Sequence, residues 1–276
     1  NRSTSRDLLF FRTTLITFPF LTIQVEGELF VIRGILSATT AMRAQVLNQE
    51  VIANNLSNAD TVAYQKDKAT FTSFHDVLIY RVESFSRPAV IGGLGSGTVL
   101  HDIATSTSQG PLKSTDNPLD IALPEGSYLA VETPLGTRYT RMGDLRVKDG
   151  YLTVSGYRVL GENGPIEVED YTMLNVSEDA RVLGDGDEIA RLAVYSFPPD
   201  ATLKKVGNSL FRADQAAANP VEMPTVSVGA LESSMVDPVS EMVSMISSLR
   251  SYEAAQKVLQ AQDETLEQAI NRVGRV

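Results

Sequence analysis

Side chains able to support catalysis or bind a metal are few and scattered in this chain of 276 residues. The chain contains no cysteine, which excludes disulfides, thiolate metal sites and cysteine nucleophiles together. Its two histidines, His75 and His101, have no H-x-x-x-H or G-x-S-x-G pattern beside them, so we expect both to be structural or exposed. The sequence therefore predicts no catalytic centre, cofactor site or metal site.

Two acidic stretches and one glycine run have the composition of ligand sites but lack the rest of the pattern. Glu167, Glu169 and Asp170 have no conjugate base or metal ligand nearby, which is typical of a solvated face. The acidic turn 184–188 lacks the distal glutamate of an EF-hand loop, so we expect a solvated hairpin turn. The glycine-rich run 92–97 has no following helix or lysine, which argues against phosphate binding and favours a flexible crossing.

The charge and hydropathy of the chain exclude two classes of partner. There are 34 acidic and 24 basic residues, a net charge of -10, and no basic run exceeds the pair Lys204-Lys205, so a nucleic-acid partner is disfavoured. No stretch reaches the roughly 18 uninterrupted apolar residues of a membrane span, so we expect no membrane insertion.

The strongest structural pattern lies in residues 237–276. Two rows at seven-residue spacing predict a long helix with one mostly apolar seam. Asp237 fits the N-cap, Pro238 the first helical position and Gly274 the end of the helix. Two polar seam positions, Gln256 and Asp263, would fix the register against a partner helix. The rows are Met242, Leu249, Gln256, Asp263, Ile270 and Met245, Tyr252, Leu259, Leu266, Val273.

A second seam occupies residues 32–58, near the other end of the chain. Its rows are Ile35, Met42, Gln49, Leu56 and Ala38, Gln45, Ile52, Ala59. Either helix alone would fit an ordinary surface helix on a globular core. Two seams that bracket a non-helical middle favour pairing of the two helices with each other or with neighbouring subunits.

The middle of the chain has the pattern of an all-β domain. Short β segments separated by turn signals such as Asp149-Gly150 run from 111 to about 212. We expect strands at 119–122, 128–132, 137–140, 144–148, 151–154, 157–160 and 189–197.

Residues 1–30 do not continue these patterns. Their apolar part is interrupted by Arg12 and Pro19, and no small-residue cleavage site follows, so a secretory signal peptide is a poor interpretation. Val31 begins the helical pattern and suits the alternative start codon GTG, while residues 26–28 suit the purine-rich codons of a ribosome-binding site. We hypothesise that the native protein begins at Val31 and that residues 1–30 are a non-native leader.

A dense polar segment ends the N-terminal helix. Asn54, Asn55, Asn58 and Asp60 are too closely spaced for a helix interior, because their side chains compete for backbone groups. The segment 53–64, Ala-Asn-Asn-Leu-Ser-Asn-Ala-Asp-Thr-Val-Ala-Tyr, resembles the signature of the flagellar rod, hook and hook-basal-body family.

Other stretches extend the resemblance over nearly all of residues 31–276. The segment 242–257 resembles the C-terminal helix of the family through M-V-S-M-I, R-S-Y-E-A and Lys257, and 117–122, 139–141 and 156–161 resemble its middle domain. The chain departs from the family at Ala63 and Gln65, where members usually carry Gly and a basic residue, so we expect the turn to differ locally.

The resemblance implies a structural, non-enzymatic subunit of the bacterial flagellar basal-body rod, which polymerises through its terminal helices. Implied partners are further copies, other axial proteins of the rod and hook, and the flagellar export apparatus, which subunits pass without a cleaved signal peptide. The predicted assembly interface comprises Ile35, Met42, Ile52, Asn54, Asn55, Leu56, Asn58, Tyr64, Met242, Met245, Leu249, Tyr252, Leu259, Leu266 and Ile270.

Two alternatives stay open at this point. A hook or other axial protein of the same family is separated poorly from a rod protein, although the compact middle favours rod. A carbohydrate-binding β domain with helical dimerisation arms would need an aromatic or paired acidic cluster, and the chain has no Trp.

We therefore predict an α+β fold in which long N- and C-terminal helices pair as a coiled-coil-like stalk beside a central all-β domain. Because both seams contain polar residues, we expect the helices to be frayed in the monomer and ordered only on polymerisation. The expected parts are a leader (1–30), the N-terminal helix and turn (31–64), an extended crossing (65–110), the β domain (111–222), a linker (223–236) and the C-terminal helix (237–276).

Overall fold

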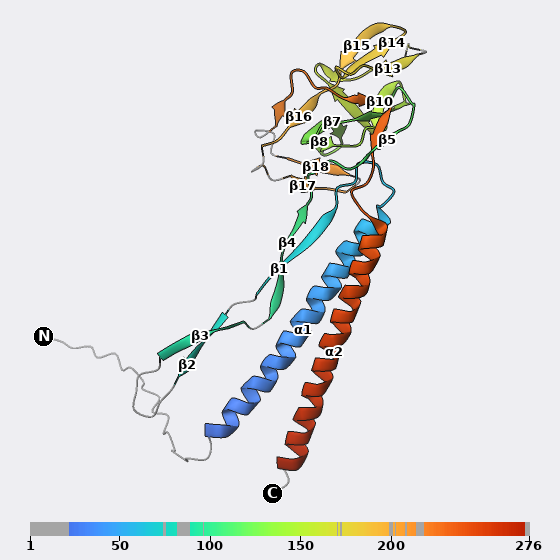
Figure 1. The fold of residues 1–276 in the computed structure, drawn as a ribbon. Coiled ribbons are helices and arrows are strands. Elements are labelled where there is room, and N and C mark those ends of the chain that lie inside the picture. The colour runs from blue at the N-terminus through green and yellow to red at the C-terminus, as the bar shows by residue number, and fades with distance from the viewer. Residues whose placement is uncertain are drawn as a thin grey trace, which may run out of the picture.

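The protein is elongated, with two helices at one end and a body of β-strands at the other (Figure 1). The computed structural model describes residues 22–73, 76–81, 89–95, 97–169, 171, 173–198, 201, 203–207, 209–213 and 218–273. Helices α1 (Thr22–Ser57) and α2 (Pro238–Val273) lie side by side and pack on each other. The predicted α+β fold with paired terminal helices is therefore confirmed. Most of the hypothesised leader, residues 1–21, lies outside the described residues, and 22–30 belong to α1.

The start of α2 follows from its capping residues. Asp237 accepts a hydrogen bond at Oδ1 from the backbone N of Val239 at 3.2 Å, which satisfies one of the free N–H groups of the first turn. Pro238 then begins the helix, as predicted. The helix ends at Val273, and the predicted stop residue Gly274 lies outside the described residues.

Two narrow antiparallel ribbons connect α1 to the body. Strands β1 (Asp67–Ser73) and β4 (Thr98–Thr105) form the first, which runs beside α1, and β2 (Asp76–Arg81) and β3 (Ala89–Gly95) form the second (Figure 1). The glycine run was expected to be a flexible crossing, and this is wrong for the part that lies in β3. That part pairs in register with β2, because the apolar β2 sequence supplies a strand partner for it.

The β body is built around one large antiparallel sheet with the strand order β17-β18-β8-β7-β11-β10-β9, joined by β12, β16 and β19. Smaller sheets pair β13, β14 and β15, β20 with β6, and β21 with β5. The strands are β5 (Leu112–Ser114), β6 (Ile121–Ala122), β7 (Ser127–Thr133), β8 (Gly136–Thr140), β9 (Arg146–Lys148), β10 (Tyr151–Val154), β11 (Tyr157–Gly161), β12 (Gly164–Pro165), β13 (Leu174–Val176), β14 (Arg181–Gly184), β15 (Asp187–Arg191), β16 (Val194–Ser196), β17 (Lys204–Lys205), β18 (Leu210–Arg212), β19 (Asn219–Pro220), β20 (Ser227–Val228) and β21 (Ala230–Glu232).

Local turn chemistry sets several hairpins of this sheet. Asp149 and Gly150 have φ of 52° and 75°, the left-handed pair that a two-residue hairpin turn requires between β9 and β10. The acidic turn 184–188 is likewise a hairpin turn, between β14 and β15. The strand expected at 189–197 is instead two strands, β15 and β16, because Leu192 and Ala193 leave the ladder between them.

The buried apolar clusters lie within the β body. The larger centres on residues such as Leu129, Leu152 and Val159, each fully buried. A second cluster on the other face stacks aromatic rings edge to face, including Tyr139 and Phe197 at 4.9 Å between ring centroids. Neither cluster includes a residue of α1 or α2, so the body has a hydrophobic core independent of the helices.

Candidate assembly site

The seam between the helices uses one of the two predicted rows of α2. The α2 residues that are not exposed follow alternating steps of four and three, the spacing of a coiled-coil seam. They are Glu241, Met245, Ser248, Tyr252, Ala255, Leu259, Gln262 and Leu266. The predicted row of Met245, Tyr252, Leu259 and Leu266 therefore lies in the seam, while the side chain of Val273 is outside the described residues.

The other predicted row of α2 points away from α1. Met242, Leu249 and Ile270 are 51%, 48% and 69% exposed, and Gln256 and Asp263 of the same row are exposed too. The prediction that Gln256 and Asp263 interrupt the seam with α1 is therefore wrong. The physical reason is that one partner helix covers only a narrow stripe, whereas the two rows together span a wider face. Exposed Val239, Val243 and Ile246 enlarge this surface, which we call the outer stripe: Val239, Met242, Val243, Ile246, Leu249 and Ile270.

The α1 side of the seam is made largely of small and polar residues. Ile52 and Ala38 are buried, and the predicted row residues Ile35, Met42 and Leu56 are half-buried. Midway along, Ser248 donates a hydrogen bond from Oγ to Oε1 of Gln45 at 2.8 Å, so Gln45 is a polar layer in the seam as predicted. Such a layer fixes the register of a helix pair while adding little apolar burial.

Contacts at the two ends of the pair show that it is antiparallel. Gly34 of α1 lies against the side chain of Gln262, near the C-terminal end of α2. At the other end of α1, Asn55 faces Glu241 in the first turn of α2.

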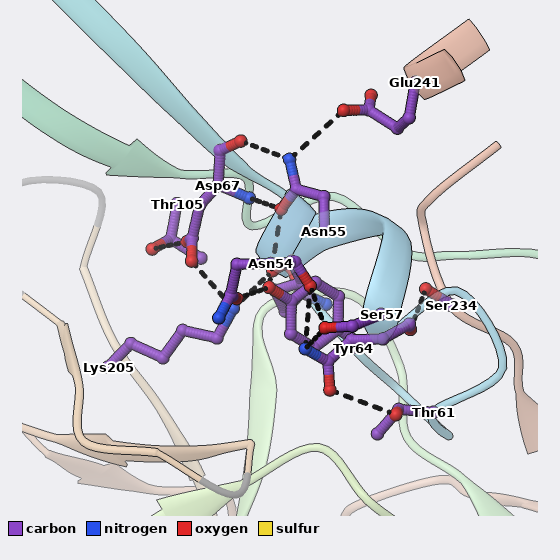
Figure 2. Close-up of polar contacts among 12 residues, drawn as sticks. Asn54, Asn55, Ser57, Thr61, Tyr64, Asp67, Thr105, Lys205, Ser234 and Glu241 are labelled. Atoms are coloured by element: carbon purple, nitrogen blue, oxygen red, sulfur yellow. Dashed lines mark hydrogen bonds and ion pairs between the residues drawn. The ribbon is translucent and has the colours of Figure 1, made fainter. Parts of the chain in front are cut away.

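A polar network closes the base of the helix pair, where α1 turns into β1 (Figure 2). Asn55, 1% exposed, donates through Nδ2 to the carbonyl of Asp67 at 2.8 Å and accepts at Oδ1 from the N–H of Asp67 at 3.0 Å. Its Nδ2 also lies 3.5 Å from Oε2 of Glu241, which is paired with Lys66. The Asn55 side chain thus bonds to the backbone of Asp67 as a neighbouring strand would, and it links Asp67 to α2.

The other predicted asparagines hold the turn that follows. Tyr64 donates from its hydroxyl to Oδ1 of Asn54 at 2.7 Å (Figure 2). Asn58 donates through Nδ2 to the Asn54 carbonyl at 2.8 Å. Oδ1 of Asn58 accepts a hydrogen bond from Thr61 at 3.2 Å. Burial raises the pKa of Tyr64 to about 12, and the negative charge of Asp67 adds to the effect.

Ala63 has a backbone conformation that favours glycine, the residue that the family resemblance leads one to expect here. Its φ is 50°, in the left-handed region that costs an L-residue about 1–2 kcal/mol. The strained residue is fully buried, and its N–H donates to the carbonyl of Glu232 at 2.8 Å. The turn therefore keeps a glycine-like conformation despite the methyl group.

A buried ion pair fastens the body to the chain segments that lead into the helices. Arg141 and Glu232 have fully buried side chains, with Nη2 of Arg141 2.5 Å from Oε2 of Glu232. Arg141 also donates to the carbonyl of Ser127 at 3.0 Å, while Glu232 accepts from the N–H of Gly110 at 3.0 Å and from Nε2 of Gln65 at 3.3 Å. Both charges are thus well satisfied, the condition under which a buried pair is tolerated.

Sequence reasoning missed several of these residues. Glu241 and Ser248 continue the heptad spacing of Met245 and Tyr252, a signal that a search for apolar residues alone overlooks. Arg141 lies in segment 139–141, which resembles the family's middle domain, but nothing in the sequence pairs it with the distant Glu232.

Among the residues that the structure describes, no group of three or more His, Cys, Asp or Glu side chains could hold a metal ion. Over the same part of the chain, neither helix combines the length and the hydropathy needed to cross a membrane. His101 is exposed on β4, and His75 lies outside the described residues.

Both ends of the chain match family models. Residues 35–65 match the flagella basal body rod protein family, and residues 227–272 match the C-terminal family of the flagellar basal body rod proteins FlgEFG. These two segments contain the polar turn and most of α2.

Known proteins are similar over nearly the whole chain. The flagellar hook-basal body complex protein FlhO of Bacillus subtilis is 31% identical over 270 residues, covering 89% of this chain and 100% of that protein. The flagellar basal-body rod protein FlgG of Agrobacterium fabrum is 32% identical over 255 residues, covering 84% and 96%. The rod protein FlgF of Escherichia coli is 32% identical over 249 residues, covering 82% and 93%.

Proposed function

This chain belongs to the flagellar basal-body rod protein family, and from that premise we propose that its outer stripe is the surface through which copies pack into a tube. The protein is a structural, non-enzymatic component of the rod, and it assembles with other axial proteins of the basal body.

The outer stripe carries this proposal. Its apolar side chains occupy the face of α2 that α1 does not cover, and they lie along one side of the helix. Five of the six residues lie within 239–249 and form an exposed apolar patch, of the kind that marks an interaction site when it is not part of a core. Ile270 lies farther along the same row, beyond the exposed Gln256 and Asp263. Packing against the helices of neighbouring copies would bury it and would use both predicted rows of α2. The residues at the base of the pair, Asn54, Asn55, Asn58 and Tyr64, contribute by holding the helices in place.

We further propose that the helices become fully ordered only in the assembly. The seam buries small and polar residues such as Ala38 and Ser248, and neither apolar cluster of the protein reaches it. Ordering one residue costs about 1–2 kcal/mol of backbone entropy, which a narrow seam offsets poorly. The β body, with its own core, stays folded in the monomer.

The route to the assembly is part of the same proposal. An axial subunit must leave the cytoplasm, and helices that are marginal before assembly suit export in an unfolded state through the flagellar export apparatus. If the protein still left the cytoplasm in cells lacking that apparatus, this part of the proposal would be wrong.

Thiol labelling tests the outer stripe directly, because the chain has no cysteine of its own. Leu249→Cys should react with a maleimide in the monomer and be protected in isolated basal bodies. Met223 is an 89% exposed residue of the body, so Met223→Cys reports the reactivity of a free thiol in each preparation. Labelling after unfolding in urea gives the total amount of reactive thiol. Equal reactivity of Leu249→Cys in monomer and basal body would exclude the outer stripe as the interface.

A further inference from the structure

Two chain segments join the β body covalently to the first ribbon and the helices, and the side chain of Lys205 adds a contact across the groove between the two parts. The segments are 106–111, which follows β4, and 233–237, which precedes α2. A groove of about 1470 Å³ lies between the two parts, lined by Asn54, Asn58 and Tyr64 at the helix base and by strands β17 and β18 of the body. Lys205 of β17 reaches across this groove.

The ammonium group of Lys205 is fully engaged at the helix base. Its Nζ donates to the carbonyl of Gln65 at 2.8 Å and to Oδ2 of Asp67 at 3.0 Å, and it lies 3.6 Å from the centre of the Tyr64 ring. The side chain is 16% exposed, so most of its hydration is replaced by these contacts. Burial lowers the pKa of Lys205, and the hydrogen bond to Asp67 opposes this effect. A neutral side chain would leave the Asp67 carboxylate without its cation.

The contacts of Asp67 extend this connection to both helices. Its other carboxylate oxygen accepts from Oγ1 of Thr105 on β4 at 2.7 Å, and its backbone N–H and carbonyl hold the side chain of Asn55 in α1 (Figure 2). Asn55 in turn faces Glu241 in the first turn of α2. A continuous series of polar contacts therefore runs from the body through Lys205 to the base of both helices.

We propose that Lys205 is a positioning residue that locks the angle between the β body and the helix pair. The chain segments 106–111 and 233–237 act as a hinge, and the contact of Lys205 with the helix base limits rotation about it. The neighbouring Lys204 is exposed in the same strand, and no contact of its side chain with the helix base is present in the described part of the chain. The lock is a property of the single subunit and does not depend on which surface mediates assembly.

Spin-label distances measure this angle in the monomer. Labels on Ala53→Cys, exposed in the last turn of α1, and on Leu135→Cys, exposed at the β7–β8 turn, report the position of the body relative to the helix base. The parent should give a narrow distance distribution by double electron–electron resonance. Lys205→Met should broaden it at least twofold, whereas Lys204→Met, the matched control, should leave it unchanged.

A second variant removes the same contact from the other side. Asp67→Asn keeps the backbone groups that bind Asn55 but removes the carboxylate that pairs with Lys205, and it should broaden the distribution in the same way. It also provides the test if Lys205→Met fails to fold. Distributions for the folded variants that are as narrow as that of the parent would overturn the proposal.

Discussion

Replacing Leu249 by aspartate should prevent incorporation into the rod while leaving the monomer intact. Fully burying a leucine side chain contributes about 1.5–3 kcal/mol, and Leu249 is 48% exposed, so roughly half of that, about 1 kcal/mol, is gained at each contact between copies. The aspartate forfeits this gain and must also bury an unpaired carboxylate, at a cost of several kcal/mol. Each contact should therefore weaken more than about 100-fold.

Complementation provides the assay. Cells lacking the native gene would express Leu249→Asp, and immunoblots of isolated basal bodies would measure incorporation. The thermal unfolding of the purified monomer should match that of the parent, because Leu249 touches neither apolar cluster of the body. Leu249→Met, which keeps an apolar side chain of similar size, is the control and should incorporate normally. Incorporation of Leu249→Asp at the parent level would refute the reasoning.

Three further predictions concern the seam and its base. Leu259→Asp places a charge in the seam against α1, so it should prevent incorporation and also lower the residual helicity of the monomer, measured by circular dichroism. Glu232→Gln leaves the buried Arg141 guanidinium unpaired and should lower the free energy of unfolding in urea by about 3–5 kcal/mol. The pKa of Tyr64 is raised from 10.0 to about 12, so its stabilising contribution, up to about 2–3 kcal/mol, is complete below pH 10.0 and is lost as the pH rises through about 12. Urea unfolding on either side of that window measures this loss.

Each of these predictions has a matched control. Val258→Asp, on an exposed residue outside the seam, should leave the monomer's helicity unchanged, and an equal loss in both variants would count against the seam. The double variant Arg141→Met/Glu232→Leu should recover much of the stability that Glu232→Gln loses, since it removes both buried charges. Tyr64→Phe should lose less stability than the parent as the pH rises through about 12, because it has no phenol group to ionise at this position. An equal loss of stability in the two proteins would assign the loss to other groups.

Local patterns were sufficient to predict the helices and much of the β body. The seven-residue rows, the Asp237 cap and turn pairs such as Asp149-Gly150 are local signals, and the structure contains the elements they predict. The Asn-rich turn was recognised both from its poor fit to a helix interior and from its resemblance to a known family.

The choice of seam could not be predicted, because it depends on the position of the partner. The rows of Leu249 and Tyr252 are neighbours on α2, and the sequence of α2 alone does not say which of them α1 covers. The β2–β3 ribbon was missed for a related reason. A strand that contains glycines such as Gly92 and Gly93 has little strand propensity, and its structure comes from pairing with the apolar segment 76–81 that precedes it.

The base of the helix pair shows a second limit. In the sequence, Lys205 is one half of a basic pair, and only the fold brings its ammonium to the Asp67 carboxylate. Contacts of this kind join residues more than a hundred positions apart, and no periodicity in the sequence records them. The sequence gives the charge of each residue, but it does not identify the residue that the charge pairs with in the fold.

Hydrogen exchange on the monomer and on isolated rods tests the central claim most directly. If the helices are ordered by packing against neighbouring copies, amides in 34–50 and 245–271, beyond the base of the pair, should exchange rapidly in the dilute monomer and become strongly protected in the rod. Amides of the large β sheet should be protected equally in both. Strong protection throughout both helices in the dilute monomer, unchanged on assembly, would contradict the account.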